Sequence, residues 1–281
     1  MRKNITLGNG KPYIFDNMKI MGIINATPNS FFEGSRVSSL DIAVERALQM
    51  INDGAQILDI GGESTRPGSE PVDVNEEIAR VVPLIREIRK YNKDILISVD
   101  TYRSKTAEES IKAGADIIND ISGLTFDDNM ASIAAKYKVP IIIMHIKGTP
   151  KDMQENPYYT DVIKEMKEFF KDRIDYALSK GISRDKIMID PGIGFGKLYE
   201  HNIEIIKKID EFYEFDMPIL LAVSRKGMIG TALGGLKAEE RLEGTIAISC
   251  YAAQIGIEMV RVHDVLENNR AVRMTEVLRN E

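Results

Sequence analysis

Polar side chains follow each short apolar segment of this sequence, at the point where the segment ends. They are Asn25, Asp59, Asp100, Asn119, His145, Asp190, Ser224 with Arg225 and Lys226, and Arg261 with His263. If the segments are buried parallel strands, these groups meet at one end of a sheet, where each needs a partner to offset its desolvation. Any one of them could instead cap a turn or a helix. We favour that role for Asp59, because Gly61-Gly62 follows it, but the set as a whole indicates a binding site.

Four of these residues have complementary hydrogen-bonding groups. Asp100, Asn119, Asp190 and Lys226 provide two carboxylates, an amide and an ammonium. A carboxylate can accept two parallel N–H bonds from a ring nitrogen and its neighbouring amino group, and an ammonium can donate to a ring carbonyl. The set therefore predicts recognition of a planar, guanidine-like heterocycle edge. A metal site built from the same carboxylates is the alternative, although no pair has the histidine spacing of a strong metal motif.

Arg261 and His263 are two residues apart on an expected strand, so both side chains point to the same face. The planar fork of arginine suits phosphate oxygens, and histidine adds a hydrogen-bond donor. The pair is expected to bind an anion. A structural salt bridge with the nearby Asp264 is the alternative.

The segment from Asp190 to Lys197, DPGIGFGK, has a glycine at every second position after an apolar run. Such glycines allow the backbone to approach a ligand closely. The spacing is not that of the dinucleotide-binding fingerprint. By itself the segment is weak evidence for any particular ligand.

Two long loops, residues 25–39 and 61–73, carry further groups that chemistry could use. They are Asn29, Ser30 and Glu33 in the first loop, and Ser64, Thr65 and Arg66 in the second. Phe31-Phe32 favours a lid in the first loop, because exposed aromatic residues in a loop usually have something to cover. A variable surface connection is the alternative for both loops.

The elements that must position these residues alternate along the chain. The expected strands are Ile20–Asn25, Ile57–Ile60, Ile95–Val99, Asp116–Asn119, Pro140–Met144, Ile187–Ile189, Ile219–Val223 and Met259–Val262. The expected helices between them include Leu40–Ile51, Val74–Tyr91, Ser104–Ala113, Asp161–Ser179, Ile203–Tyr213 and Arg241–Gln254. About eight such units without a linker favour an α/β fold, a (β/α)8 TIM barrel formed by residues 1–281 as a single domain, over an open sheet or two domains. Asn4–Phe15 is expected to form a short hairpin, with Gly8-Asn9-Gly10 at its turn, that closes the lower mouth of the barrel.

Composition excludes several classes of protein. With 43% hydrophobic and 28% charged residues, the chain can form a core and a soluble surface. A formal net charge of -6 argues against nucleic acid as the main partner. One cysteine, Cys250, excludes an intrachain disulfide, and no apolar run has the length of a membrane span. We expect a cytoplasmic protein with no membrane partner.

Eight sequence motifs, in this order, resemble those of the dihydropteroate synthase family. They are MGIINATPNSFFEGSR, DIGGESTRPGSEPV, SVDT, INDISG, MHIKGTP, DPGIGFGK, SRK and RVHDV, and they extend from Met21 to Val265. The resemblance implies condensation of 6-hydroxymethyl-7,8-dihydropterin pyrophosphate with p-aminobenzoate, which gives 7,8-dihydropteroate and pyrophosphate in folate synthesis. It implies Mg²⁺, no redox cofactor, and a homodimer formed through late barrel helices.

The resemblance also implies roles for individual residues. The pterin would be bound by Asp100, Asn119, Met144, Asp190 and Lys226. The pyrophosphate would be bound by Asn25, Arg66, Arg261 and His263, with Asn25 also helping to hold the magnesium ion. The p-aminobenzoate would be bound by Thr65, Arg66, Pro67, Phe195 and Gly227. Asn25, Lys226, Arg261 and His263 would act in catalysis, and Ser30, Phe31 and Glu33 in the closing loop.

This chain departs from the family pattern in three places. Many relatives have aspartate where this chain has Asn29, and commonly where it has Glu33. Glu33 keeps a carboxylate, whereas Asn29 removes one charge, which leaves the organisation of the closed loop open. Gly227 stands where some relatives have serine, so only its backbone N–H is available to the p-aminobenzoate carboxylate. Cys250 is expected to serve only in packing.

Two other functions remain as alternatives. Pterin-binding methyltransferase domains share the pterin pocket but pass a methyl group to a corrinoid, and the STRPG loop and SRK turn of this chain argue against that chemistry. A catalytically silent pterin-binding or partner protein is the third hypothesis, and the Asn29 change is the only feature that favours it.

Overall fold

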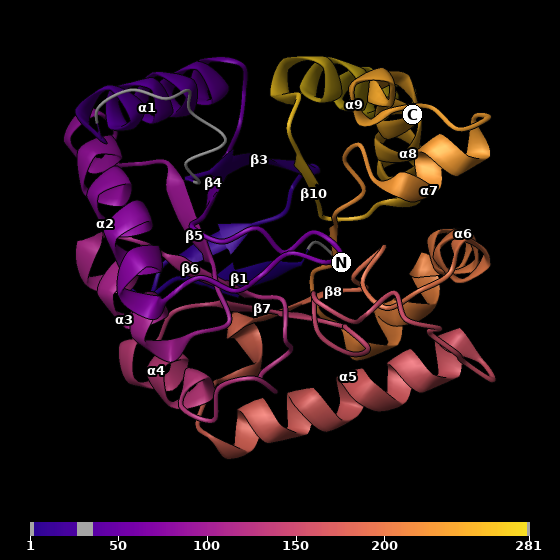
Figure 1. The fold of residues 1–281 in the computed structure, drawn as a ribbon, viewed down its shortest axis with the longest axis horizontal. Helices are drawn as coiled ribbons and strands as arrows, with labels where there is room; N and C mark the ends of the chain where they lie inside the picture. The colour runs from indigo at the N-terminus through magenta and orange to yellow at the C-terminus, as the bar shows by residue number, and fades with distance from the viewer. Residues whose placement is uncertain (1–2, 27–35, 280–281) are drawn as a thin grey trace.

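The computed structural model describes residues 3–26 and 36–279. Within them, parallel strands form a central ring that helices surround (Figure 1). The strands of the ring are β3 (Lys19–Asn25), β4 (Ile57–Gly61), β5 (Leu96–Asp100), β6 (Ile117–Asp120), β7 (Ile141–Met144), β8 (Ile187–Asp190), β9 (Leu220–Leu221) and β10 (Met259–Val262). The helices are α1 (Arg36–Asn52), α2 (Val74–Tyr91), α3 (Ser104–Ala113), α4 (Met130–Tyr137), α5 (Val162–Ser179), α6 (Tyr199–Lys207), α7 (Gly227–Ala232), α8 (Leu242–Ile255) and α9 (Val265–Arg279).

The ring has the strand order β8-β7-β6-β5-β4-β3-β10-β9. A parallel bridge between Ile189 and Ile219 joins its two ends, beside β8 and β9. Each strand returns to its neighbour through a helix on the outside, as parallel connections require. The predicted (β/α)8 TIM barrel is therefore confirmed.

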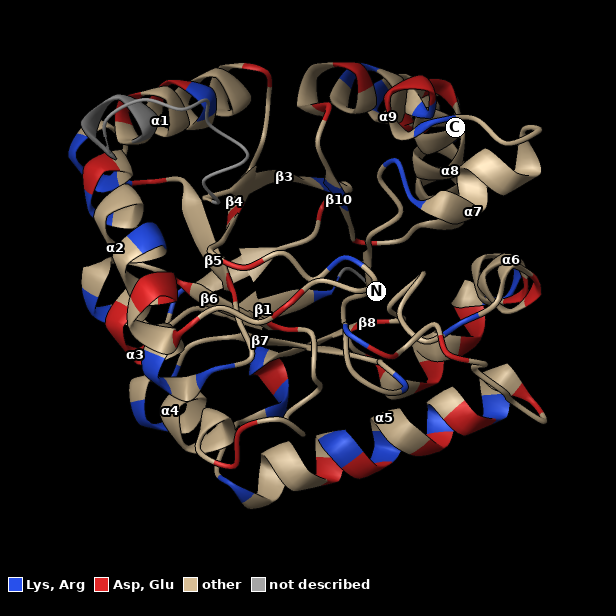
Figure 2. Ribbon diagram, viewed as in Figure 1, with Lys and Arg blue, Asp and Glu red and all other residues tan. Residues whose placement is uncertain are grey.

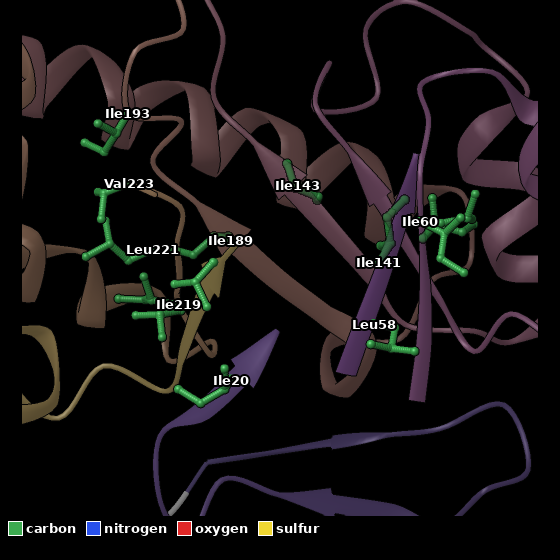
Figure 3. Packing of buried hydrophobic residues seen from close by; sticks show 14 of the residues in the cluster. Ile20, Leu58, Ile60, Ile141, Ile143, Ile189, Ile193, Ile219, Leu221 and Val223 are labelled. Carbon is green, nitrogen blue, oxygen red and sulfur yellow. The ribbon is translucent and has the colours of Figure 1, made fainter. Parts of the chain in front are cut away.

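Residues within each strand alternate between two environments because successive side chains point to opposite faces. On β4, Leu58 and Ile60 belong to the large apolar cluster between the sheet and the helices, in which Ile141 and Ile143 of β7 also lie (Figure 3). Ile57 belongs to a different cluster, inside the barrel. The positions two and four residues after such a floor residue also face the interior, and several of them, such as Asp59, Asp100 and Arg261, are polar.

The floor of the barrel is apolar and is closed by the N-terminal hairpin. Each strand contributes one residue to it: Met21, Ile57, Leu96, Ile117, Ile142, Met188, Leu220 and Met259. The hairpin pairs β1 (Asn4–Thr6) with β2 (Pro12–Ile14), turns at Gly10 with φ +81°, and adds Ile5 and Phe15 to the same cluster. The predicted plug of the lower mouth is confirmed.

The predicted elements differ from the structure in a few places. The expected helix Ile203–Tyr213 is two elements, α6 and a 3-10 helix η3 (Ile209–Phe215), because Lys208 leaves the helical conformation (φ -114°, ψ 21°). The expected strand Ile219–Val223 is shorter in the structure, where β9 covers Leu220–Leu221 and Ile219 adds the single bridge to Ile189. The expected helices did not include α4, α7 and α9. α4 and α7 have 8 and 6 residues, too short for a clear helical period.

Charged residues lie mainly on the outer helices (Figure 2). Along α5 the blue and red segments alternate, whereas the strands are mostly tan except near their ends. In the described part of the chain, no helix combines the length and apolarity needed to cross a membrane.

Candidate active site

Polar residues form a layer directly above the apolar floor of the barrel. Asp59, Asn119, Asp190 and Arg261 each lie two positions after a floor residue of their own strand. The period of two therefore points all four side chains into the barrel. Asp59 is 0% exposed and Asp190 is 2% exposed, so the layer is sealed from solvent on the floor side.

Arg261 lies at the centre of this layer and pairs with two carboxylates. Its Nε donates to Asp59 Oδ2 (2.5 Å), and its Nη2 donates to Asp100 Oδ2 (2.6 Å). Asn119 Nδ2 also donates to Asp59 Oδ2 (3.1 Å). The four residues thus form one network that joins β4, β5, β6 and β10.

One expectation about this region, and one alternative, are corrected. Asp59 does not hold the backbone of the Gly61-Gly62 turn: its recorded partners are Arg261 and Asn119. Its place two residues after the floor residue Ile57 is the signal in the sequence that should have identified it. Asp264 does not pair with Arg261 either; it binds Arg225 through both oxygens (2.7 and 3.0 Å).

Burial shifts the charge states in this network. Desolvation raises the pKa of Asp100 to about 7, although the charge of Arg261 opposes the change. Burial alone would lower the pKa of Arg261, but the carboxylates of Asp59 and Asp100 outweigh it and raise that pKa above its ordinary value. Arg261 therefore remains a permanent cation, whereas Asp100 can change its charge near neutral pH.

Three buried oxygens of this network have no hydrogen-bond partner among the described residues. They are the Oδ1 atoms of Asp59, Asp100 and Asn119. A buried acceptor without a partner is costly, so such atoms are usually satisfied by a ligand or by water. The network thus offers acceptors to a ligand that presents N–H donors.

Asp190 and Lys226 lie on the other side of the barrel mouth. Asp190 Oδ1 accepts a hydrogen bond from the backbone N–H of Gly192 (2.7 Å). Lys226 donates to the carbonyl of Ile193, and its Nζ lies 4.7 Å from the ring centroid of Phe195. Burial lowers the pKa of Lys226 to about 8, although the charge of Asp190 opposes the change. The carboxylate at the end of β8 and the ammonium at the start of α7 therefore lie close to each other.

His263 lies beside the cations of the site. Burial and then the charge of Arg261 lower the pKa of His263 to about 4, and Arg66 also contributes. The ring is therefore neutral at pH 7. Ser224 Oγ lies 2.9 Å from Nδ1 and accepts the backbone N–H of His263 (3.1 Å). With the hydroxyl proton assigned to Nδ1, Nε2 carries the ring proton and can donate it to a ligand.

The second loop is fastened by a network that the sequence analysis missed. Glu63 accepts the N–H of Val72 (2.9 Å) and pairs with Arg103 (2.8 Å). Arg103 also binds Glu77 (2.9 Å) and the carbonyl of Val72 (2.9 Å). These bonds close the base of the loop that carries Thr65, Arg66 and Pro67, of which Thr65 is half-buried and the other two are exposed. Contacts between separate elements do not appear in local sequence patterns.

The remaining expected residues lie around the same mouth. Asn25 is half-buried at the end of β3 and is in register with Gly61, which is in register with Asp100. Met144 is 3% exposed at the end of β7, Phe195 is half-buried, and Gly227 is exposed at the start of α7. The first-loop residues Asn29, Ser30, Phe31 and Glu33 lie outside the described residues. Cys250 is a half-buried free cysteine on α8.

A barrel with an apolar floor, a polar layer of carboxylates above it, cations at the rim and unpartnered acceptors defines an α/β-barrel enzyme that binds a planar, N–H-rich ring and an anionic group. The family of pterin binding enzymes matches residues 21–263. A dihydropteroate synthase of Clostridium beijerinckii is 45% identical over 273 residues, which are 97% of this chain and 98% of that protein.

Solved structures agree with this result. The dihydropteroate synthase of Clostridium difficile in the presence of pteroic acid has a TM-score of 0.88 at 44% identity, covering 95% of this chain and 98% of that one. The enzyme of Xanthomonas albilineans with 4-aminobenzoic acid has a TM-score of 0.92 at 34% identity and covers 100% of both chains. The chain belongs to the dihydropteroate synthases, within the pterin binding enzymes.

Proposed function

We propose that this dihydropteroate synthase condenses 6-hydroxymethyl-7,8-dihydropterin pyrophosphate with p-aminobenzoate at the carboxyl end of the barrel, using the residues described above. The observation that carries the proposal is the convergence of unpartnered acceptor oxygens from Asp59, Asp100 and Asn119 beside the cation of Arg261. Two of the similar structures support the proposal, because pteroic acid contains both the pterin and the p-aminobenzoate parts of the product and 4-aminobenzoic acid is the second part alone.

The pterin ring would lie across the polar layer. Its 2-amino group and adjacent ring N–H can donate to a carboxylate of Asp190 or Asp100, and Asn119 can both donate and accept. Lys226 would donate to the ring carbonyl, and Met144 would contact the ring face. Asp59 was not expected in the site; we now include it as the carboxylate that holds Arg261 and Asn119 in place.

The pyrophosphate would lie against the cations at the rim. Arg261, Arg66 and the Nε2–H of neutral His263 can all bind phosphate oxygens. The proximity of Arg66 and Arg261 to His263, which lowers its pKa, supports this grouping. An approaching anion would raise that pKa again and so strengthen the donor.

Magnesium fits the chemistry of the site through Asn25. Its amide oxygen is the kind of hard donor that Mg²⁺ prefers, and it is half-buried on a strand adjacent to β4 and β10. Because groups of three His, Cys, Asp or Glu residues suited to a metal are absent from the described residues, phosphate oxygens and water would complete the coordination. When bound, the ion would neutralise charge on the pyrophosphate.

The p-aminobenzoate would enter between the second loop and the turn at Lys226. Thr65 and Pro67 would form one wall and Phe195 the other, while the backbone N–H of Gly227 and the charge of Arg66 would attract the carboxylate. Gly227 begins α7, although that helix is too short for its terminus to be a strong anion site on its own.

Catalysis follows from the placement of charge. As the bond from the pterin methylene to the pyrophosphate oxygen breaks, Arg261 and His263 stabilise the departing anion. Asp100 and Asp190 stabilise the positive charge that develops on the pterin. The aniline nitrogen then forms the new C–N bond and loses one proton. No protein nucleophile takes part.

We further propose that residues 1–281 act as one domain and that the enzyme is a homodimer. A single domain is supported by the hairpin, which completes the core of the barrel rather than forming a unit of its own. The dimer is supported by an apolar stripe on α9, where Met274, Val277 and Leu278 are 55%, 66% and 71% exposed, three and four residues apart.

The proposed function is tested by pyrophosphate release from the dihydropterin substrate with Mg²⁺. We expect release to depend on p-aminobenzoate, with 7,8-dihydropteroate formed in equal amounts. Release that proceeds equally without p-aminobenzoate would contradict the synthase assignment, and transfer of a methyl group to a corrinoid would favour the methyltransferase instead.

The Lys226→Ala variant tests the site. Loss of a charged hydrogen bond should weaken pterin binding by about tenfold or more, while the far-ultraviolet circular dichroism stays that of the wild type. Lys237→Ala, outside the proposed site, is the control. Kinetics of Lys226→Ala that match those of the control would contradict the assignment of Lys226.

A further inference from the structure

Lys197 is a buried lysine at the end of the DPGIGFGK segment, with 2% of its surface exposed. Its Nζ lies 2.9 Å from each of His145 Nδ1, the Gly192 carbonyl and the Phe195 carbonyl, and 3.2 Å from the His145 carbonyl. Four possible acceptor atoms therefore surround Lys197 Nζ. The ion pairs of the described residues do not include Lys197, although buried lysines usually have a carboxylate partner.

The charge states of this pair fit the geometry. Burial, followed by the charge of Lys197, lowers the pKa of His145 well below its usual range. His145 is thus neutral, and Nδ1 is free to accept the hydrogen that Lys197 donates. Burial also lowers the pKa of Lys197 well below its usual range, although the charge of Asp190 opposes the change, and Nζ is held by polar groups of this loop and of the end of β7.

These bonds join two segments. Gly192 and Phe195 lie in the loop between β8 and α6, and Phe195 N donates to the Gly192 carbonyl (3.0 Å), which closes a turn. Lys197 binds both carbonyls of that turn and fastens it to His145, which follows β7. The loop therefore cannot shift without breaking several of these bonds.

Other side chains secure the same loop. Tyr159 Oη donates to the Gly196 carbonyl (2.8 Å), Asn202 accepts the Gly194 N–H (2.7 Å), and Gln154 donates to the Gly194 carbonyl (2.7 Å). The backbone also lies directly against its neighbour: a Cβ on Gly192 would lie 2.0 Å from the His145 carbonyl oxygen. A larger residue there would have to displace the loop.

The position of this loop determines the position of Phe195. The ring of Phe195 lies 4.7 Å from Lys226 Nζ, and Lys226 donates to Ile193 in the same loop. The backbone of Asp190, by contrast, is held by the barrel itself: it is in register with Met144, and its carbonyl accepts the N–H of His145 (3.0 Å). Its Oδ1 also accepts the Gly192 N–H (2.7 Å), a single bond to the loop. Loosening the loop should therefore disturb Phe195 more than Asp190.

We propose that Lys197 is a positioning residue that holds the loop of Gly192–Gly196 against β7 and thereby sets Phe195 as a wall of the p-aminobenzoate pocket. The inference rests on the proposed function, because Phe195 is assigned to that pocket there. Lys197 acts through the loop carbonyls and does not itself touch either substrate.

Steady-state kinetics of Lys197→Met test the proposal. The variant keeps an unbranched side chain but removes the Nζ hydrogen-bond donor. We expect KM for p-aminobenzoate to rise about tenfold, while KM for the dihydropterin pyrophosphate changes by less than about threefold. A role in stability alone would lower the amount of active enzyme and leave both KM values unchanged.

Lys186→Met is the matched control. Lys186 also ties backbone carbonyls, those of Thr6 (2.7 Å) and Leu7 (3.2 Å), but at the opposite end of the barrel. It should lower thermal stability without separating the two KM values. A rise of KM for p-aminobenzoate alone in Lys186→Met, as expected for Lys197→Met, would overturn the proposal.

Tyr159→Phe is measured alongside, because it removes one loop hydrogen bond and keeps the packing, so it folds even if Lys197→Met does not. We expect KM for p-aminobenzoate to rise about threefold in this variant. Values within experimental error of the wild type in Tyr159→Phe, or in a folded Lys197→Met, overturn the proposal. Failure of the proposed function is seen separately, as wild-type protein without p-aminobenzoate-dependent pyrophosphate release.

Discussion

Two opposing effects act on the charge of the Asp100 carboxylate: burial disfavours it and the neighbouring Arg261 favours it. It ends β5 at the rim of the polar layer, pairs with Arg261 through Oδ2, and leaves Oδ1 without a partner among the described residues. Burial raises its pKa from 3.8 to about 7. The folded protein therefore binds a proton there between about pH 4 and pH 7 that the unfolded chain has lost, and this group favours folding less as pH rises through that range.

The same shift predicts a pH dependence of pterin binding. The ionised form of Asp100 accepts N–H donors, so affinity should fall as pH is lowered from about 8 to about 6. Calorimetric titration with 6-hydroxymethyl-7,8-dihydropterin tests this. The pyrophosphate is left out because phosphate groups titrate near pH 6 themselves. In Asp100→Asn, affinity should be about tenfold lower at pH 8 and should vary less with pH.

Asp120→Asn is the control for this titration. Burial raises the pKa of Asp120 to about 6, but its oxygens bind Ser122 and Leu124, and it lies on the opposite face of β6 from Asn119. The pH dependence should be the same as in the wild type. A flat wild-type profile would contradict the role assigned to Asp100.

The hairpin of β1 and β2 is the element that closes the barrel floor. Ile5 of β1 is 0% exposed and packs with the floor residues, whereas Ile14 of β2 is 50% exposed. Isoleucine thus occurs on both the buried and the exposed face of one hairpin, which gives a matched pair of substitutions. The floor residues lie two positions before the residues of the polar layer on the same strands. Substitutions in the floor should therefore change the free energy of unfolding, and substitutions in the polar layer should change catalysis.

Ile5→Ala should lower the free energy of unfolding by about 3 kcal/mol, because it leaves a cavity in the floor. Ile14→Ala should lower it by less than about 1 kcal/mol. Urea denaturation followed by circular dichroism measures both, and kcat should remain that of the wild type in each. Equal effects of the two substitutions would show that the hairpin does not plug the barrel.

At the scale of the whole molecule, an apolar stripe lies on the surface of the described residues outside the barrel core. It lies on α9, beside α8, whose Tyr251 is 41% exposed. Charged residues are spread along the outer helices, and α9 carries some of them beside the stripe (Figure 2). The stripe is therefore the surface that we assign to the partner subunit.

Leu278→Glu should dissociate the dimer, because it places a charge in an apolar contact. Analytical ultracentrifugation should give twice the chain mass of 31.5 kDa for the wild type and the chain mass for the variant. Leu178→Glu, which changes a 37% exposed leucine on α5, should remain dimeric. A wild-type monomer, or a dimeric Leu278→Glu, would contradict this assignment.

Much of this protein could be predicted from its sequence because local patterns carry the information. The alternation of short β-rich runs with helical stretches predicts the barrel, and the bounds of α2 and α3 agree with the expected ranges. The family motifs, and the polar residues that end each run, predict the type of ligand. Short or weakly periodic elements such as α7 were missed, since a few residues do not define a period.

The sequence by itself therefore determined the barrel, the family and the set of residues at the strand ends. Only the tertiary structure decided which of those residues bind one another: that Asp59 and Asp100 share Arg261, that Asp264 holds Arg225, and that Lys197 fastens the glycine loop. The physical reason is that alternation and spacing depend on neighbouring residues, whereas ion pairs, burial and the pKa shifts they cause depend on atoms that the fold brings together from strands far apart in the chain.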